Sequence, residues 1–574
     1  MSDGVLRLIP GVGVARAYDR SWLAPDVVAG LVLTAILIPV GMGYAQAAGL
    51  PPITGLYATI IPLLLYAVFG PSRILVLGPD SSLAAIIAAT VAPLALGDPT
   101  RATDLAAALA LISGAFCIAF GVLRLGLLTD LLSKPIRIGY LNGIALTVFI
   151  GQLPKLFGFS VDGEGVIAIG RDFLVGVADG ETVPAALAVG LVAFAIIAGC
   201  RRWLPAIPGV LIAAVGGTAL VGFLGLAASA GVPVVGPLPQ GLPTFGVPAV
   251  SFEDIAAMVA GGLAIAVVSM ADTSVLSRTL AARAGTKVDP NQELLALGVA
   301  NAGAGLFHGF SISASTSRTP VAEQAGAKTQ LAGVVGALTT AALLVFAPGI
   351  TTNLPQSVLA AIVMTACLSL VDIRGLVRLW RLRPSEFALS IVCFAGVALV
   401  GVVQGIFLAV ALALAAFIWR AWRPYSAILG RVDGLKGYHD LTRYPQARQV
   451  DGLILFRWDA PLFFANAETF REQVEAAVAA AATPTRWVVV AAEPVTEIDM
   501  TAADMLAELI ESLEREGVSL RVAELKDPTK DLLKRYGLFE TLGAHAFFPT
   551  VGSAVDAYLA ETGTPWDDWE DRGP

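Results

Sequence analysis

The chain has 574 residues, of which 56% are hydrophobic and 14% are charged, whereas an ordinary soluble protein carries about 25% charged residues. Residues 1–425 hold 23 Lys+Arg against 20 Asp+Glu, and residues 426–574 hold 14 against 25. The acidic second part argues against a nucleic-acid partner, because phosphate binding needs clustered Lys and Arg. The four cysteines form no Cys-x-x-Cys pair and the three histidines are scattered, so we expect no metal site and no cofactor.

The first three-quarters of the chain contains repeated apolar segments. About 20 apolar residues cross the ~30 Å hydrocarbon core of a bilayer as a helix. Twelve such segments and two shorter, interrupted ones predict an α-helical polytopic membrane protein with 14 transmembrane segments. They cover residues 22–42, 50–69, 80–96, 105–125, 135–153, 183–200, 207–227, 253–272, 292–307, 312–325, 330–347, 354–371, 386–402 and 404–420. We therefore expect an N-terminal segment over 1–21 and a transmembrane domain over 22–425.

Loop charges predict the orientation of these segments. If the N-terminus is inside, the cytoplasmic loops carry 14 basic residues and the outer loops carry three. This distribution follows the positive-inside rule and places both termini in the cytoplasm. The 29 Arg against 8 Lys favour a bacterial source, and hence the inner or plasma membrane of a bacterium.

The two interrupted segments occupy the third and tenth positions, seven spans apart. One follows Gly78-Pro79 and the other follows Gly309. Broken segments at matching positions of two halves are typical of a transporter built as an inverted repeat. A half-helix N-terminus has free N–H groups and a partial positive charge, so two of them near the midplane would form an anion pocket. The alternative is that Gly and Pro only kink packed helices.

Hydroxyl and charged groups cluster at these two breaks. Arg318 brings a permanent charge to membrane depth, where charges are costly and usually functional. The alternative for Arg318 is snorkelling to an interface or pairing with an acid. Asp80 either caps the third segment or titrates in the pocket wall, and Tyr44 either lines the same cavity or packs in the core. The candidate substrate-binding residues are Tyr44, Asp80, Ser81, Ser315, Thr316, Ser317 and Arg318.

Asp272 stands late in an apolar segment, where a lone carboxylate needs a partner, a cation or a proton. It could couple transport to H⁺ or Na⁺, as could Asp80, or it could pair with Arg318. We find no catalytic triad, no phosphate-binding glycine loop and no metal motif, so an enzyme is not expected.

Residues 426–562 alternate strand and helix patterns. Strands are predicted at 453–458, 487–491 and 518–523, and helices at 467–481, 502–516 and 527–536. This alternation indicates a small cytoplasmic α/β domain. Residues 563–574 are acidic and are predicted to be a solvated tail.

Several ordered motifs resemble the SulP anion transporters, which include mammalian solute carrier family 26 and prestin. The motifs are Pro51-Pro-Ile-Thr-Gly-Leu-Tyr57, Phe69-Gly-Pro-Ser-Arg73, Gly78-Pro79, Phe310-Ser-Ile-Ser313, Ser317-Arg-Thr319, Lys328-Thr-Gln-Leu-Ala-Gly333 and Leu354-Pro-Gln-Ser-Val-Leu-Ala360. The C-terminal domain resembles a STAS domain. Its Asp499 and Thr501 fall on the Asp-x-Ser/Thr loop, where Thr501 is either a phosphosite or a capping hydroxyl.

The resemblance implies a 7+7 inverted repeat with core and gate domains, an anion site between the third and tenth helices, and a homodimer. Ser317 and Arg318 fall on the anion-coordinating pair, Asp272 on an acid of helix eight, and Tyr44 on an aromatic of helix one. The chain departs from the family at three positions. Val40 stands where some relatives carry Gln or Glu, and Asp80 replaces a neutral residue. Leu276 stands where the Na⁺-dependent bicarbonate members resemble one another in having a Thr.

These features together predict a secondary active transporter of small inorganic oxyanions, with sulfate as the first candidate substrate. Transport would occur by proton symport or anion exchange with an elevator-like, alternating-access movement. Bicarbonate and C4-dicarboxylates are the alternative substrates. A protein of another class, a membrane sensor or scaffold that signals through the STAS domain without transport, is the alternative function.

Overall fold

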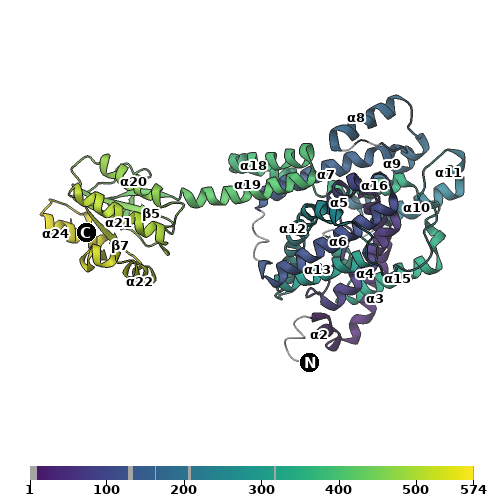
Figure 1. Ribbon diagram of the computed structural model, residues 1–574, viewed down its shortest axis with the longest axis horizontal. Coiled ribbons are helices and arrows are strands. Elements are labelled where there is room, and N and C mark those ends of the chain that lie inside the picture. Colours follow the sequence, from purple (N-terminus) through teal and green to yellow (C-terminus); the bar gives the residue numbers. More distant parts are fainter. Residues whose placement is uncertain are drawn as a thin grey trace. The chain divides into compact units, whose positions relative to one another are not determined.

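A computed structural model describes residues 9–126, 133–161, 163, 165–204, 208–315 and 318–572 (Figure 1). The chain divides into two compact units, Met1–Ala413 and Leu414–Pro574. The first unit is almost entirely helical, and the second is an α/β domain that follows the end of a long helix. Each unit is described below by itself.

The helices of the first unit overlap all fourteen predicted segments, although only the second half of segment 312–325 is helical within the described residues. In chain order they are α2 (Pro10–Arg16), η1 (Arg20–Trp22), α3 (Leu23–Ala47), α4 (Pro52–Phe69), α5 (Ser81–Ala95), α6 (Pro99–Val122), α7 (Lys134–Phe157), α8 (Gly165–Ala178), α9 (Pro184–Trp203), α10 (Gly209–Leu224), α11 (Leu226–Ser229), α12 (Phe252–Arg283), α13 (Pro290–Leu306), α14 (Arg318–Gln324), α15 (Leu331–Phe346), η3 (Pro348–Thr351), α16 (Gln356–Leu368), α17 (Ile373–Leu382), α18 (Pro384–Ala395), η4 (Gly396–Val400) and α19 (Val402–Trp422).

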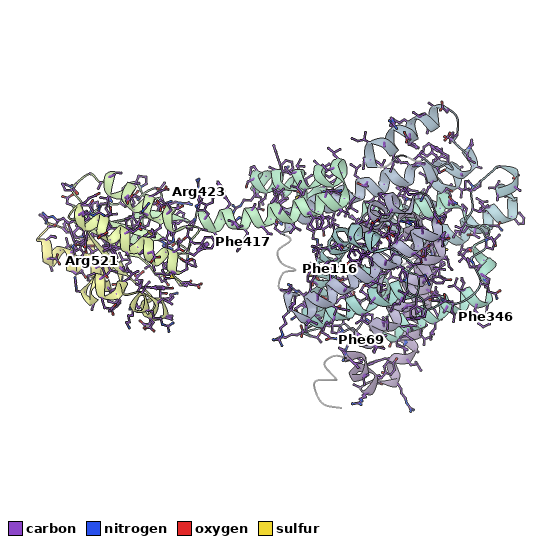
Figure 2. The ribbon with its side chains drawn as sticks, in the orientation of Figure 1. Phe69, Phe116, Phe346, Phe417, Arg423 and Arg521 are labelled. Atoms are coloured by element: carbon purple, nitrogen blue, oxygen red, sulfur yellow. The ribbon has the colours of Figure 1, made fainter. Side chains whose placement is uncertain are left out.

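Eight helices in the described part of the chain are long and apolar enough to cross a membrane, and four shorter apolar helices accompany them. Phe346, which is 84% exposed, projects from the edge of this unit (Figure 2). Such outward apolar side chains suit a surface that faces lipid rather than water. The count of 14 crossings stays a prediction, because α14 is only one short helix of seven residues.

The helices of the first unit pack in two groups. In one group α13 packs on α6 and α4, α15 packs on α3, and α12 packs on α6 and α5. In the other group α7 packs on α16 and α18, and α9 packs on α10 and α16. Each group combines helices from both halves of the chain, which is the arrangement expected of two interlocked repeats.

The second unit is built on a six-stranded sheet in the order β4-β3-β5-β6-β7-β8. Its elements are β3 (Ser426–Arg431), β4 (Tyr438–Asp440), β5 (Leu453–Trp458), α20 (Ala467–Ala479), β6 (Trp487–Ala491), α21 (Met500–Arg515), β7 (Ser519–Ala523), α22 (Asp527–Arg535), α23 (Leu538–Leu542), η5 (Ala544–Ala546), β8 (Phe547–Phe548), α24 (Val551–Thr562) and η6 (Trp569–Arg572). Strands β5 to β8 are parallel, and β3 is antiparallel to β4 and β5. The predicted strands and helices of this domain are confirmed.

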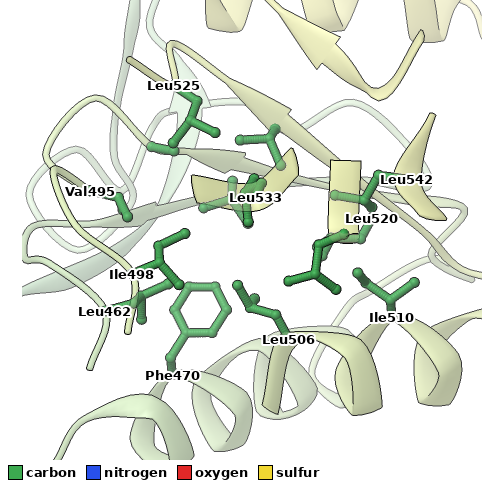
Figure 3. A pocket seen from close by; sticks show the side chains of 14 residues that line it. Leu462, Phe470, Val495, Ile498, Leu506, Ile510, Leu520, Leu525, Leu533 and Leu542 are labelled. Atoms are coloured by element: carbon green, nitrogen blue, oxygen red, sulfur yellow. The ribbon is translucent and has the colours of Figure 1, made fainter. Parts of the chain in front are cut away.

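Alternate residues of the central strands face two separate cores, as a buried sheet requires. Ile454 and Phe456 pack toward α20 and α21, while Leu453 and Leu455 pack toward α24. The first core is lined wholly by apolar side chains and holds a cavity of about 40 Å³ (Figure 3). An apolar void of this size stays dry.

Residues 563–570 of the predicted solvated tail are exposed or half-buried, and one of their acids contacts the domain. The side chain of Asp568 is only 14% exposed and pairs with Arg431 on β3. The sequence places many acids together at the end of the chain but does not show that β3 carries a buried guanidinium 137 residues earlier. That charge attracts the tail back onto the sheet edge, because a buried guanidinium needs carboxylate partners.

Candidate anion site

The two broken segments meet as a two-residue antiparallel ladder. Strand β1 (Leu77–Gly78) pairs with β2 (Ser313–Ala314), with Leu77 opposite Ala314 and Gly78 opposite Ser313. β1 leads into α5 and β2 leads toward α14, so the ladder fixes the starts of both short helices beside one another. The sequence predicted the two breaks, and the structure adds the direct pairing between them.

Both helix starts are capped by residues from the predicted site. The Asp80 side chain accepts a 3.0 Å hydrogen bond from Ser82 N and so caps α5. The Ser315 hydroxyl accepts a 3.2 Å hydrogen bond from Arg318 N at the start of α14. Asp80 therefore acts as a helix cap, one of the two roles considered for it. Thr316 and Ser317, predicted as substrate contacts, lie outside the described residues.

Arg318 is the largest charged group at this site. The residue is 1% exposed, so it does not snorkel to an interface. Its Nη2 donates to the Pro79 carbonyl on the opposite broken segment. Its Nε and Nη1 have no hydrogen-bond partner among the described residues. A buried guanidinium with two unsatisfied nitrogens is an electropositive site with donors free for an anion.

The glycine of Gly78-Pro79 makes room for this guanidinium. Gly78 has φ +153°, and a Cβ placed on it would lie 3.2 Å from Nη1 of Arg318. A side chain at position 78 would therefore crowd the charged group as well as strain the backbone.

Two carboxylates and a tyrosine lie around the start of α5. Ser82 Oγ lies 2.8 Å from Asp80 Oδ1 and 3.2 Å from Asp272 Oδ2, so it links the two acids. Tyr44 is 3% exposed and lies near Asp80, Ser81 and Arg318. Ser81 is itself buried at 4% exposure. The structure thus gathers Tyr44, Asp80, Ser81, Ser315, Arg318 and Asp272 in one region.

Asp272 sits inside α12, eleven residues before its end, and not near a helix terminus. Within the described residues, the salt bridges that the structure contains do not include one between Asp272 and Arg318. Asp272 Oδ2 instead accepts a hydrogen bond from Ser82 Oγ at 3.2 Å. The alternative that Asp272 pairs with Arg318 is therefore not the arrangement seen here.

Asn301 on α13 is a supporting residue that the sequence analysis missed. It is fully buried, its Nδ2 donates to the Ile312 carbonyl at 3.1 Å, and its Oδ1 accepts from Ile312 N at 2.8 Å. These two bonds hold the segment that enters β2. The sequence feature that could have identified Asn301 is its side-chain amide, which stands alone in the small-residue run Ala300-Asn301-Ala302-Gly303 of an apolar helix.

Glu293, also missed, anchors the segment that enters β1. This carboxylate is 1% exposed and accepts hydrogen bonds from Tyr66 and, at 3.2 Å, from Ser72. Gln330 Nε2 donates to the carbonyls of Ser72 and Leu75 at 2.8 Å. Thr319 Oγ1 accepts a bond from Val76 N. Buried polar groups therefore hold both strands of the ladder from neighbouring helices.

The residues of the predicted STAS loop have different environments. Asp499 accepts 2.8 Å hydrogen bonds from Ala502 N and Phe464 N, so it caps α21 and fixes a neighbouring loop. Thr501 lies exposed in the first turn of α21. The capping group of this helix is thus Asp499, which leaves the Thr501 hydroxyl accessible from solvent.

This fold and this site define a class: a polytopic membrane protein with two paired half-helices and a C-terminal STAS domain. Residues 23–393 match the sulfate permease family, and residues 444–554 match the STAS domain. The chain therefore belongs to the sulfate permease family.

Named relatives cover nearly the whole chain. A probable sulfate transporter of Mycobacterium tuberculosis is 41% identical over 549 residues, which is 96% of this chain and 98% of the relative. The chloroplastic sulfate transporter 4.1 of Arabidopsis thaliana is 30% identical over 97% of this chain and 83% of the relative. The inward-facing structure of the murine solute carrier 26 family member A9 anion transporter has a TM-score of 0.90 at 24% identity, with 98% of this chain and 95% of that chain covered. This last likeness shows the fold.

Proposed function

We propose that this chain is a secondary active transporter of a small inorganic oxyanion, with sulfate as the first candidate substrate. The observation that carries the proposal is Arg318, buried between the two broken segments with two nitrogens free of partners in the described part of the chain. A forked guanidinium of this kind suits the tetrahedral oxygens of an oxyanion. Similarity to proteins named as sulfate transporters supports sulfate as the first choice.

The site favours alternating access, with elevator-like movement, over a continuous pore. Arg318, Ser313 and Ser82 are buried, so an anion at this position would be enclosed on all sides by packed helices. Release of such an anion requires one group of helices to move against the other. In this proposal both termini lie in the cytoplasm and the protein acts as a homodimer.

We further propose that Asp80 and Asp272 carry the coupling proton. Ser82 has one hydroxyl proton, yet its oxygen lies within hydrogen-bond distance of both carboxylates. If both carboxylates are ionised, the two contacts share this one proton, whereas protonation of one carboxyl lets it donate to Ser82 Oγ and gives two full hydrogen bonds. Proton binding at this pair beside Arg318 would tie the protonation state to the anion site. Sodium coupling and anion exchange are the competing outcomes.

The proposal is tested by uptake of labelled anions into proteoliposomes, with sulfate, bicarbonate and fumarate compared under imposed pH and Na⁺ gradients. We expect sulfate uptake that an inward proton gradient stimulates. Faster uptake of bicarbonate or fumarate than of sulfate would reassign the substrate. No flux of any of the three would favour the non-transporting sensor.

The coupling groups are tested separately with Asp272→Asn and Asp80→Asn. At least one of the two variants should transport with a flattened pH dependence, because an amide cannot take up the proton. Arg101→Ala is the control, since Arg101 pairs with Asp254 near the surface and away from these acids. Unchanged pH dependence in both variants would remove this pair from the coupling mechanism.

A further inference from the structure

The STAS domain contains a second buried guanidinium, and its ligand is part of the chain itself. Arg431 on β3 is 5% exposed. Its Nε donates to both carboxylate oxygens of Asp568, at 3.1 and 2.8 Å, and its Nη2 lies 2.9 Å from Asp568 Oδ1 and from Glu570 Oε2. Its Nη1 donates to the Gly437 carbonyl at 3.0 Å. This is the geometry of a forked arginine on an oxyanion, with tail carboxylates in the ligand position.

Aromatic rings lie beside the Arg431 guanidinium. The Arg431 guanidinium lies 5.5 Å from the ring centroids of both Tyr438 and Trp569, one from the domain and one from the tail. A second arginine, Arg448, stacks on Trp566 at 4.8 Å and donates to the Asp567 carbonyl at 2.8 Å. Residues 566–570, which we call the tail segment, therefore bind through charges and stacking on two arginines.

The tail segment does not fill the space that it encloses. A cavity of about 680 Å³ lies at this edge of the sheet. Its wall includes the cations Arg431, Lys436 and Arg457 and the acids Glu493, Glu524 and Asp556 of the domain, together with Trp566, Asp568 and Glu570 of the tail. The tail is therefore one wall of a polar cavity, and release of the tail would expose the Arg431 donors to that cavity.

The attachment of the tail is of a kind that anions can displace. Helix α24 ends at Thr562, its C-cap Gly563 has φ +64°, and the described residues after it form no strand of the sheet. The Glu570 side chain is 43% exposed. Burial raises the pKa of Asp568, but hydrogen bonds from Arg431, Glu570 N and Trp566 together with the charge of Arg431 leave that pKa lowered, so the tail binds as a carboxylate at neutral pH.

We propose that Arg431 is the centre of an oxyanion-binding site in the STAS domain, and that the tail segment is a built-in competitor for it. The free ligand is a doubly charged inorganic oxyanion such as sulfate or phosphate. An intramolecular ligand on a short linker acts at an effective concentration in the mM range, so the free anion displaces the tail only at comparable concentrations. The site is independent of which anion the membrane unit carries.

The test uses the full chain and a variant that ends at Pro565, both purified in detergent, with a fluorescent peptide of residues 563–574 as the probe. The shortened chain should bind the peptide at least tenfold more tightly than the full chain, whose own tail occupies the site. At matched ionic strength, sulfate or phosphate should displace the peptide at a concentration at least tenfold below that of chloride. Sulfate and phosphate are tested separately, so their displacement concentrations show which oxyanion the site prefers.

Two variants link the binding to Arg431. Arg431→Met in the shortened chain should lose peptide binding, while Arg521→Met should keep it, because Arg521 stacks on Trp487 instead of on the tail. In the full chain, Asp568→Asn combined with Glu570→Gln weakens binding of the tail to Arg431 and leaves β3 unchanged. This double variant should therefore bind the peptide. Equal binding by full and shortened chains, no binding to the shortened chain, or chloride as effective as both oxyanions would overturn the proposal.

Discussion

Arg318 in the membrane unit and Arg431 in the STAS domain are both buried guanidinium groups, and they differ in how they are satisfied. Arg431 has five contacts to two tail carboxylates and a carbonyl. The Arg318 guanidinium makes one hydrogen bond within the described part of the chain, to the Pro79 carbonyl, and two of its nitrogens have no partner there. The tail therefore occupies the donors of Arg431 until a competing anion displaces it, whereas the donors of Arg318 are left for an external anion.

The comparison predicts opposite outcomes for changes around the two arginines. Substitutions in the segments that position Arg318 should affect anion binding. Substitutions in the contacts of Arg431 should affect the stability of the sheet edge. Variants at Asn301, Asp568 and Gly78 test this difference in decreasing order of expected effect.

Asn301→Ala should have the largest effect, because it leaves the buried N–H and carbonyl of Ile312 without partners. Each unpaired group costs about 1–3 kcal/mol. We expect a lower midpoint for thermal denaturation in detergent and a raised KM for anion uptake. Asn142→Ala is the control, since Asn142 accepts from Asp372 N in the other helix group and should leave KM unchanged. An unaltered KM for Asn301→Ala would mean that the position of β2 does not affect anion binding.

Asp568→Asn should weaken the tail contact by about 1–3 kcal/mol, since it removes the charge that is bound to Arg431. Amide hydrogen exchange across β3 and β4 should then be roughly tenfold to a hundredfold faster, while anion affinity in the uptake assay stays unchanged. A loss of uptake affinity without faster exchange would contradict the assignment of the two arginines to separate roles.

Gly78→Ala should have the smallest effect, about 1 kcal/mol of backbone strain plus a shift of the Arg318 guanidinium by a few tenths of an ångström. We expect a several-fold rise in KM. Gly97→Ala carries similar strain, at φ +84°, but its Cβ would meet no atom within 4 Å. Equal effects of the two substitutions on KM would mean that contact with Arg318 is not the cause.

The sequence predicted the elements of both units well, because apolar segment length, Gly-Pro breaks and strand–helix alternation are local signals. It also identified Arg318, Asp80, Asp272 and Tyr44 as candidates from the cost of polar groups at membrane depth. Their spatial grouping is what the structure adds. Thr316 and Ser317 remain predictions.

Contacts between distant residues could not be predicted. Gly78 pairs with Ser313, and Arg431 binds Asp568 at a separation of 137 residues. Periodicity and composition describe neighbours in sequence and say nothing about such pairs. For the same reason the sequence did not predict the contact of the acidic tail with Arg431 or the role of Asn301 on α13.

The most direct test of the account compares Arg318→Ala with the wild-type chain in two measurements, labelled-sulfate uptake and thermal denaturation in detergent. Hydrogen bonds to charged groups contribute about 1.5–3 kcal/mol, so KM for sulfate should rise roughly tenfold to a hundredfold. The denaturation midpoint should be unchanged or higher, because an incompletely paired buried charge is lost. Wild-type affinity for sulfate in Arg318→Ala, with or without a loss of stability, would contradict the assignment of Arg318 as the anion-binding group.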